Sequence, residues 1–214
     1  MTILILIISF LIAITIHEAA HAFTSDRLGD PTAKLAGRLT LNPLAHLDLY
    51  GTILFPLILI LIGSPFVFGW AKPVGFDPFN LKNPRKDAAL ISLSGPLANL
   101  ILAFLLSLFL RFGIILPNPF SFLYLLFISV IRLNIVLAVF NLIPIHPLDG
   151  GKIFIGLLPE KDAEEADLFL NRYGSLILFL LIFPFYNGVS PLLLVISPII
   201  NFIFNLLLPF SFTT

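Results

Sequence analysis

Two histidines and a glutamate near the start of the chain have the spacing of a metal site. His17, Glu18 and His21 form an H-E-x-x-H motif. Residues four apart on a helix share one face, so both imidazoles can bind one Zn²⁺ ion. Glu18 follows the first histidine directly, where its carboxylate can act as a general base on water. A catalytic zinc usually has three protein ligands, so the motif requires a third.

The third ligand must be a histidine or a carboxylate, because the chain contains no cysteine. The candidate is Asp149, which follows Pro144 and Pro147 and precedes Gly150 and Gly151. The prolines must break a helix, and the glycines permit a sharp turn. A helix-capping role would explain the aspartate alone, but not the turn residues around it. We therefore expect this aspartate and the two histidines to hold one zinc ion per chain.

The composition of the chain is that of a membrane protein. Of its 214 residues, 58% are hydrophobic and 11% are charged, and the mean hydropathy is +1.06. Soluble domains average about 45–50% apolar and about 25% charged residues, so a soluble globule is excluded. The 12 basic residues balance the 12 acidic ones. This balance argues against nucleic acid as a partner, because surfaces that bind phosphates are basic.

The apolar residues are grouped into segments long enough to cross a bilayer. Residues 2–23, 88–110 and 120–141 each match the roughly 20 residues that span the hydrocarbon. Residues 175–210 are apolar throughout and contain a turn sequence, which predicts a hairpin of two short spans. Residues 47–70 are interrupted by glycine and proline and predict a broken or re-entrant segment. The predicted fold is an all-α polytopic membrane protein with about five transmembrane helices.

A shared metal ion restricts how these segments cross the membrane. If the three ligands bind one ion, the first and third clear spans end on the same side, and residues 47–70 must dip in and return. The polar stretches 24–48, 64–87 and 146–174 then lie on that side and hold ten of the twelve basic residues. Because basic loops favour the cytoplasm, we expect a multi-pass cell-membrane protein with its metal site toward the cytoplasmic side.

Longer motifs surround the residues of the metal site. They are His17-Glu18-Ala19-Ala20-His21, Ser94-Gly95-Pro96-Leu97-Ala98-Asn99, and Asn141-x-x-Pro144 leading to Leu148-Asp149-Gly150. Together these motifs resemble the site-2 protease family of intramembrane zinc metalloproteases. The stretches 27–46 and 69–73 are similar to its compact prokaryotic members, and we expect no PDZ or CBS domain.

The resemblance implies an intramembrane zinc metalloendopeptidase that hydrolyses peptide bonds in or near transmembrane segments, as in regulated intramembrane proteolysis. It implies His17, His21 and Asp149 as zinc ligands and Glu18 as the catalytic base. It also implies that Asn141 helps to hold the substrate or the developing oxyanion. The expected partners are a transmembrane protein substrate and the lipid bilayer, and the oligomeric state is left open.

A single membrane-embedded metalloprotease domain is expected over residues 1–214, with a core at 1–155 and a C-terminal helical hairpin at 175–210. A second interpretation is a cation transporter or channel in which the same two histidines and aspartate bind a passing ion. Broken apolar segments suit transport as well. Glu18 separates the two interpretations, because hydrolysis needs a base and transport does not.

Residues 33–41 alternate in part, with Leu35, Gly37, Leu39 and Leu41 on one side. This pattern predicts a short β element whose edge pairs with an unwound segment of the substrate. An ordinary structural hairpin fits the pattern equally well.

Overall fold

The computed structural model shows a bundle of helices. It describes residues 2–54, 58, 61, 72, 74–112, 121–184 and 189–208. The helices are α1 (Thr2–Leu28), α2 (Thr32–Leu35), η1 (Pro43–Ala45), η2 (Leu49–Leu54), η3 (Pro78–Asn80), α4 (Pro84–Arg111), α5 (Phe122–Asn141), α6 (Asp149–Leu157), α7 (Glu160–Ile182) and α8 (Pro191–Leu207). The described residues contain no β-strand, and the expected all-α class is confirmed for them.

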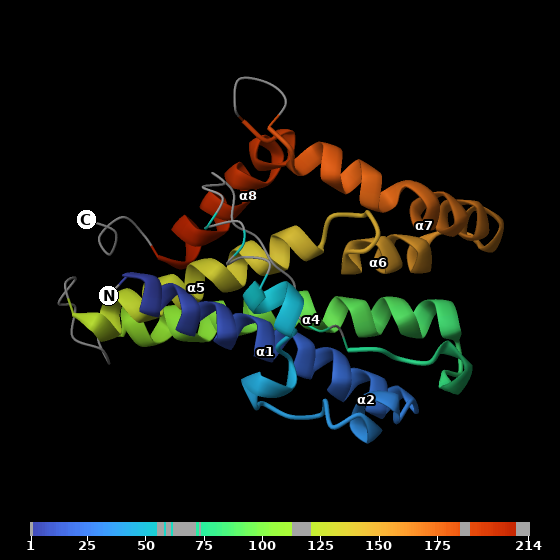
Figure 1. The fold of residues 1–214 in the computed structure, drawn as a ribbon, viewed down its shortest axis with the longest axis horizontal. Helices are drawn as coiled ribbons and strands as arrows, with labels where there is room; N and C mark the ends of the chain where they lie inside the picture. Colours follow the sequence, from blue (N-terminus) through green and yellow to red (C-terminus); the bar gives the residue numbers. More distant parts are fainter. Residues whose placement is uncertain are drawn as a thin grey trace.

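Three long apolar helices, α1, α4 and α5, form the centre of the molecule and pack side by side (Figure 1). Among the described residues, these three are long and apolar enough to cross a membrane. Helix α4 has 28 residues and extends about 42 Å at 1.5 Å per residue, which exceeds the roughly 30 Å of bilayer hydrocarbon. These helices match the three clear spans expected from the sequence.

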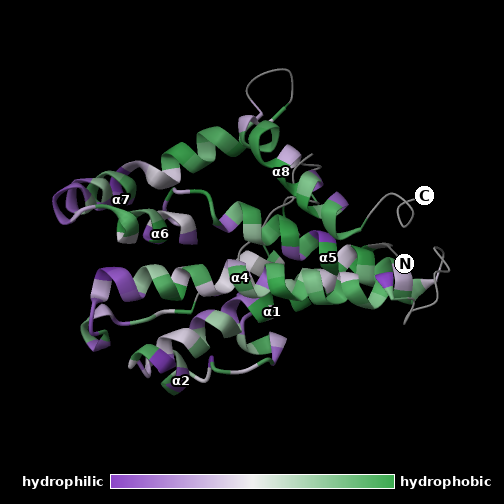
Figure 2. Ribbon diagram, turned by 180° about the vertical axis from the view of Figure 1, so that it is seen from behind, coloured by the Kyte–Doolittle hydropathy of each residue, from purple (hydrophilic) through white to green (hydrophobic). Residues whose placement is uncertain are grey.

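The polar parts of the chain gather at one end of this bundle. The end of α1, the start of α4 and the end of α5 point the same way (Figure 1). Figure 2 shows hydrophilic residues concentrated toward this end, on α2 and on the starts of α4 and α7. The arrangement is the one that a metal ion shared between the first and third spans requires.

Helix α8 packs against α5 and contributes to the main apolar core. Its buried residues recur every four positions and form one stripe: Leu192, Ile196, Ile200 and Phe204. The core residues of α5 that belong to the same cluster include Ile131, Ile135 and Val139. This packing supports α5 on the side away from α1.

The C-terminal part differs from the hairpin expected at 175–210. Helix α7 already begins at Glu160, because Glu160 and Asp162 in its first turn suit the positive end of a helix dipole. Only its second half is apolar, and α8 has 17 residues. The described residues thus contain three membrane-length helices, against about five expected. The turn expected at 187–188 and most of the segment 47–70 lie outside the described residues.

The β element expected over residues 33–41 is not formed. Helix α2 occupies its first part, and Gly37 ends that helix with a φ of 70°. The Arg38 amide donates to the Ala33 carbonyl at 2.8 Å, and the Gly37 amide donates to the Lys34 carbonyl at 3.0 Å. This pair of bonds is a Schellman cap. The glycine that fitted a strand pattern is instead the left-handed residue that stops a short helix.

The end of α1 is tied to η3, the short helix that precedes α4, through Asp30, which is fully buried. Its carboxylate accepts hydrogen bonds from the Thr32 amide at 3.1 Å, the Asn80 side chain at 2.8 Å, the Asp77 amide at 2.9 Å and the Ser25 hydroxyl at 2.9 Å. Burial by itself would raise the pKa of Asp30, but these hydrogen bonds outweigh it and hold the pKa well below its usual range. The ionised carboxylate therefore stabilises the turn between α1 and α2 and its contact with η3.

We predict that Asp30→Ala lowers the free energy of unfolding by about 2 to 4 kcal/mol, because buried donors lose a charged acceptor. The folded pKa lies below the unfolded value of about 3.9, so this stabilisation is complete at neutral pH and declines as the pH falls below about 4. Thermal melts of the detergent-solubilised protein, followed by circular dichroism, measure both effects. Glu165→Ala, at an exposed position on α7, is the control. A melting temperature equal to that of the wild type would contradict the role of Asp30.

Candidate metal centre

The side chains of His17 and His21 lie on one face of α1 and meet Asp149, the first residue of α6. His17 Nε2 is 3.0 Å from Asp149 Oδ2, and His21 Nε2 is 3.3 Å from the same oxygen. The two imidazole rings meet edge to face, with centroids 4.6 Å apart. One ligand atom from each residue lies within 4.8 Å of the others. The structure thus brings together the three residues that the sequence predicts as ligands.

Hydrogen bonds on the far side of each ring fix which nitrogen faces the aspartate. His21 Nδ1 donates to the Ile91 carbonyl at 2.7 Å. His17 Nδ1 lies 2.7 Å from Asn99 Oδ1, which can only accept. Both Nδ1 atoms therefore carry a proton in the neutral rings, and both Nε2 atoms keep a lone pair directed at Asp149. This is the tautomer that a metal ligand needs, and it is set by groups behind the ligands.

The orientation of Asn99 is fixed in turn by a chain of buried amides across three helices. Asn99 Nδ2 donates to the Ala13 carbonyl at 2.9 Å and to Asn134 Oδ1 at 2.7 Å. Asn134 Nδ2 donates to the Val130 carbonyl at 2.8 Å. Both asparagines are fully buried. Because the side-chain NH₂ groups of Asn99 and Asn134 both donate away from His17, the Asn99 oxygen is left to accept from the imidazole.

Helix α4 approaches the two rings through Gly95. A Cβ atom at this position would lie 2.6 Å from His21 Nε2 and 2.8 Å from His17 Cε1. A side chain would therefore occupy the space beside the nitrogens that face Asp149. The glycine keeps this space open, in agreement with a site that holds an ion there.

The turn before α6 places Asp149 within reach of α1. The Leu148 amide donates to the Ile145 carbonyl at 2.9 Å, and the Gly151 amide donates to the Leu148 carbonyl at 3.0 Å. A Cβ at Gly150 would overlap the carbonyl oxygens of the residues that end α5 and begin this turn. The sharp turn expected from the glycine pair is thus present, and it needs glycine because the chain folds back on itself.

Glu18 is buried beside the ligands and has a backbone partner. Its Oε2 accepts a hydrogen bond from the Val74 amide at 2.9 Å. Two residues further on, the Phe76 ring lies 4.4 Å from the ammonium of Lys152, which is on α6 one turn after Asp149. The segment before α4 and the helix that carries the aspartate therefore face each other next to Glu18.

Asn141, the remaining residue predicted for the site, is bound within its own helix. Its Nδ2 donates to the Leu137 carbonyl at 3.0 Å. No hydrogen bond in the described part of the chain joins it to the histidines or the aspartate. The sequence pointed to Asn99 only as the last residue of the 94–99 motif, and Asn134 and the Val74 amide were not expected. A polar amide in the middle of an apolar span was the signal for Asn134, whereas a backbone amide leaves no trace in the sequence.

Similar sequences occur in proteins that are named as zinc metalloproteases. A family model described as Peptidase family M50 matches residues 5–115 and 116–182. A Bacillus subtilis protein named "Putative zinc metalloprotease YwhC" is 45% identical over 159 residues, which make up 72% of this chain and 69% of that protein. A Mycolicibacterium smegmatis protein named "Putative zinc metalloprotease Rip2" is 31% identical over 182 residues, 84% of this chain and 66% of that protein. No solved structure matches the chain.

The family match covers most of the sequence. It includes α1 from residue 5 onward, all of α4 and α5, and the turn that carries Asp149. The chain spans about two thirds of the length of the two relatives. It therefore belongs to peptidase family M50 and is a zinc metalloprotease of the membrane.

Proposed function

We propose that the chain is an intramembrane metalloendopeptidase that cuts peptide bonds in or near transmembrane segments of other membrane proteins. The observation that carries this proposal is the position of the metal-ligating group. His17 and His21 are buried in the C-terminal half of the 27-residue helix α1, which packs against two further membrane-length helices. A hydrolytic site at that depth acts on segments that enter the membrane, which is the requirement of regulated intramembrane proteolysis.

Zinc fits the donor set that these residues offer. His17 Nε2, His21 Nε2 and a carboxylate oxygen of Asp149 would hold it, which is a usual ligand set for catalytic zinc. When bound, the ion supplies a Lewis acid that polarises a carbonyl group and acidifies water. Glu18 accepts the proton of the attacking water and returns it to the leaving amine. The Val74 amide holds the carboxylate of Glu18 in place for both steps.

Asn141 is proposed to bind the substrate carbonyl as negative charge develops on its oxygen. Its amide nitrogen carries two hydrogens, and one of them donates to Leu137. The second can donate to a substrate in the active site. We further propose that the protein is a multi-pass protein of the cell membrane with its active site toward the cytoplasm. Ten of the twelve basic residues lie in the three polar stretches, and Figure 2 shows hydrophilic residues gathered at the end of the bundle that carries the site, which supports this orientation.

A groove runs along the face of α1 that is turned away from His17 and His21. Two adjoining cavities of about 320 and 440 Å³ share Ile16 and Leu41 in their walls. The α1 residues that line them follow helical spacing: Ile8, Leu11, Ile12, Thr15, Ile16, Ala19, Ala20 and Phe23. The opposite wall consists of residues 39–41 and Pro43. We assign to this wall the pairing with the substrate that the sequence predicts for the whole stretch 33–41.

One polar side chain in this groove lacks a hydrogen-bond partner. Thr15 Oγ1 is buried and makes no hydrogen bond among the described residues. A buried hydroxyl without a partner is costly, and the backbone of an unwound substrate would supply one. His46 supports the opposite wall, because its Nε2 donates to the Thr40 carbonyl at 2.9 Å. An extended substrate in the groove would lie along the turns of α1 that carry His17 and His21, on the helix face opposite to the two imidazoles.

The first prediction from the proposed function concerns Glu18 as the catalytic base. Glu18→Gln is expected to retain zinc, because the ligands are unchanged and the amide oxygen can still accept from Val74. Its rate of cleavage of a transmembrane reporter should fall by about 10²- to 10⁴-fold, the usual contribution of a general base. Zinc content by elemental analysis and reporter cleavage in detergent or vesicles provide the two measurements. Cleavage at the wild-type rate would rule out the mechanism, and Zn²⁺ flux across vesicles without cleavage would favour the transporter.

The second prediction concerns the space that Gly95 leaves open. Gly95→Ala should lose stoichiometric zinc, because the new Cβ would lie 2.6 Å from His21 Nε2. Alanine favours a helix over glycine by about 1 kcal/mol, so a loss of zinc cannot be ascribed to weaker helix formation. Gly75→Ala is the control, because a Cβ there meets nothing within 4 Å. Equal zinc content in the two variants would refute the geometry of the site.

The third prediction concerns the groove. Ile12→Trp should fill the cavity near Thr15 and raise the KM for a transmembrane reporter about tenfold, with zinc content unchanged. Ile101→Trp, at an exposed position on α4, places the same side chain outside the groove. Reporter kinetics of the two purified variants compare them directly. Equal KM values would show that the substrate does not use this path.

A further inference from the structure

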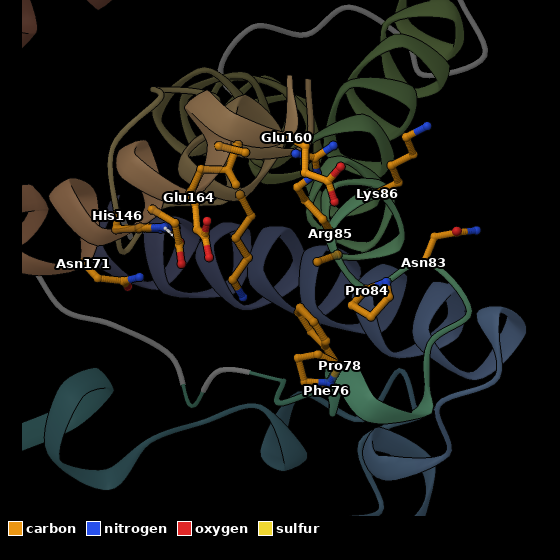
Figure 3. Close-up of a pocket in the computed structure, with 15 residues that line it drawn as sticks. Phe76, Pro78, Asn83, Pro84, Arg85, Lys86, His146, Glu160, Glu164 and Asn171 are labelled. Atoms are coloured by element: carbon orange, nitrogen blue, oxygen red, sulfur yellow. Dashed lines mark hydrogen bonds and ion pairs between the residues drawn. The ribbon is translucent and has the colours of Figure 1, made fainter. Parts of the chain in front are cut away.

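His146 lies in the turn between α5 and α6 and contacts α7. Its side chain is 12% exposed, and its Nε2 is 3.3 Å from Asp167 Oδ1. Figure 3 shows the ring on the wall of a cavity of about 710 Å³, with a dashed line marking this bond. Most ion pairs at a surface contribute little, but this imidazole is nearly enclosed. The Asp167 carboxylate is half-exposed, so the burial of the imidazole is what distinguishes this contact from a surface ion pair.

Two glycines on different helices form the notch that holds His146. A Cβ at Gly151 of α6 would lie 2.6 Å from His146 Nδ1, and a Cβ at Gly174 of α7 would lie 2.5 Å from the His146 carbonyl oxygen. Gly174 follows Asp167 by seven residues, so both lie on the same face of α7. One face of α7 thus supplies the acceptor for the ring and the gap for the backbone.

The notch is directly connected to the metal-ligating aspartate. Asp149 follows His146 by three residues, and Gly151, which contacts the ring, is in the same first turn of α6 as Asp149. The Gly151 amide also donates to the Leu148 carbonyl at 3.0 Å. A displacement of the imidazole would therefore move the turn that carries the carboxylate. Helix α7 supports that turn from outside the three-helix centre.

We propose that His146 is a positioning residue for Asp149: its imidazole, held by Asp167 and packed on Gly151, and its backbone, packed on Gly174, fix the first turn of α6 against α7. The inference rests on the proposed function, because it concerns the affinity of the same site for zinc. Groups that orient metal ligands typically change metal affinity by 10- to 100-fold when they are removed.

The test measures zinc affinity by competition with a chelator, together with the absorption bands of the Co²⁺-substituted protein. His146→Ala and Asp167→Ala are expected to bind zinc about 10 to 100 times more weakly and to alter the Co²⁺ bands. His146→Gln should restore affinity to within about threefold, because its amide nitrogen can reach the same carboxylate. Glu165→Ala, an exposed carboxylate on the same helix, is the control and should match the wild type.

Gly174→Ala provides an independent variant in case His146→Ala does not fold. It leaves both partners of the ion pair intact and should weaken zinc binding by displacing the His146 backbone. Zinc affinity and Co²⁺ bands equal to the wild type in the folded variants would overturn the role of His146 and leave the proposed function intact. Failure of the wild-type protein to bind zinc would instead overturn the proposed function.

Discussion

The burial of two histidines among apolar helices, in contact with one carboxylate, is the constraint on which the rest of the structure depends. His17 and His21 are 4% and 7% exposed, and both contact the carboxylate of Asp149. Groups of this kind are expensive inside a membrane unless each has a partner. The Asn99 oxygen and the Ile91 carbonyl provide those partners on the far side of the rings. Helices α4 and α6 are therefore held to α1 by the polar contacts of the two histidines in addition to apolar packing.

The centre of the fold could be predicted from the sequence because its signals are local and strong. Apolar runs of span length give the three central helices, and the H-E-x-x-H spacing gives one helix face with two imidazoles. Prolines followed by two glycines indicate a turn at Asp149, and the structure brings that turn to the histidines. These inferences needed only helix geometry and the cost of polar groups in hydrocarbon.

Other parts could not be predicted, because their determining contacts are distant in the sequence or involve the backbone. Residues 33–41 alternate like a strand, but Gly37 adopts a left-handed conformation and completes a helix cap. The acidic run from Glu160 opens α7, but nothing in the sequence indicates that one face of this helix contacts His146. The Val74 amide that binds Glu18 is 56 residues away from it. Side-chain pattern alone carries no information on such a bond.

The contact between His17 and Asp149 joins residues 132 positions apart, and this separation bears on biosynthesis. During synthesis His17 and His21 leave the ribosome early, whereas Asp149 follows only after α4 and α5 have been made. A nascent chain therefore passes through the insertion machinery without a complete catalytic centre.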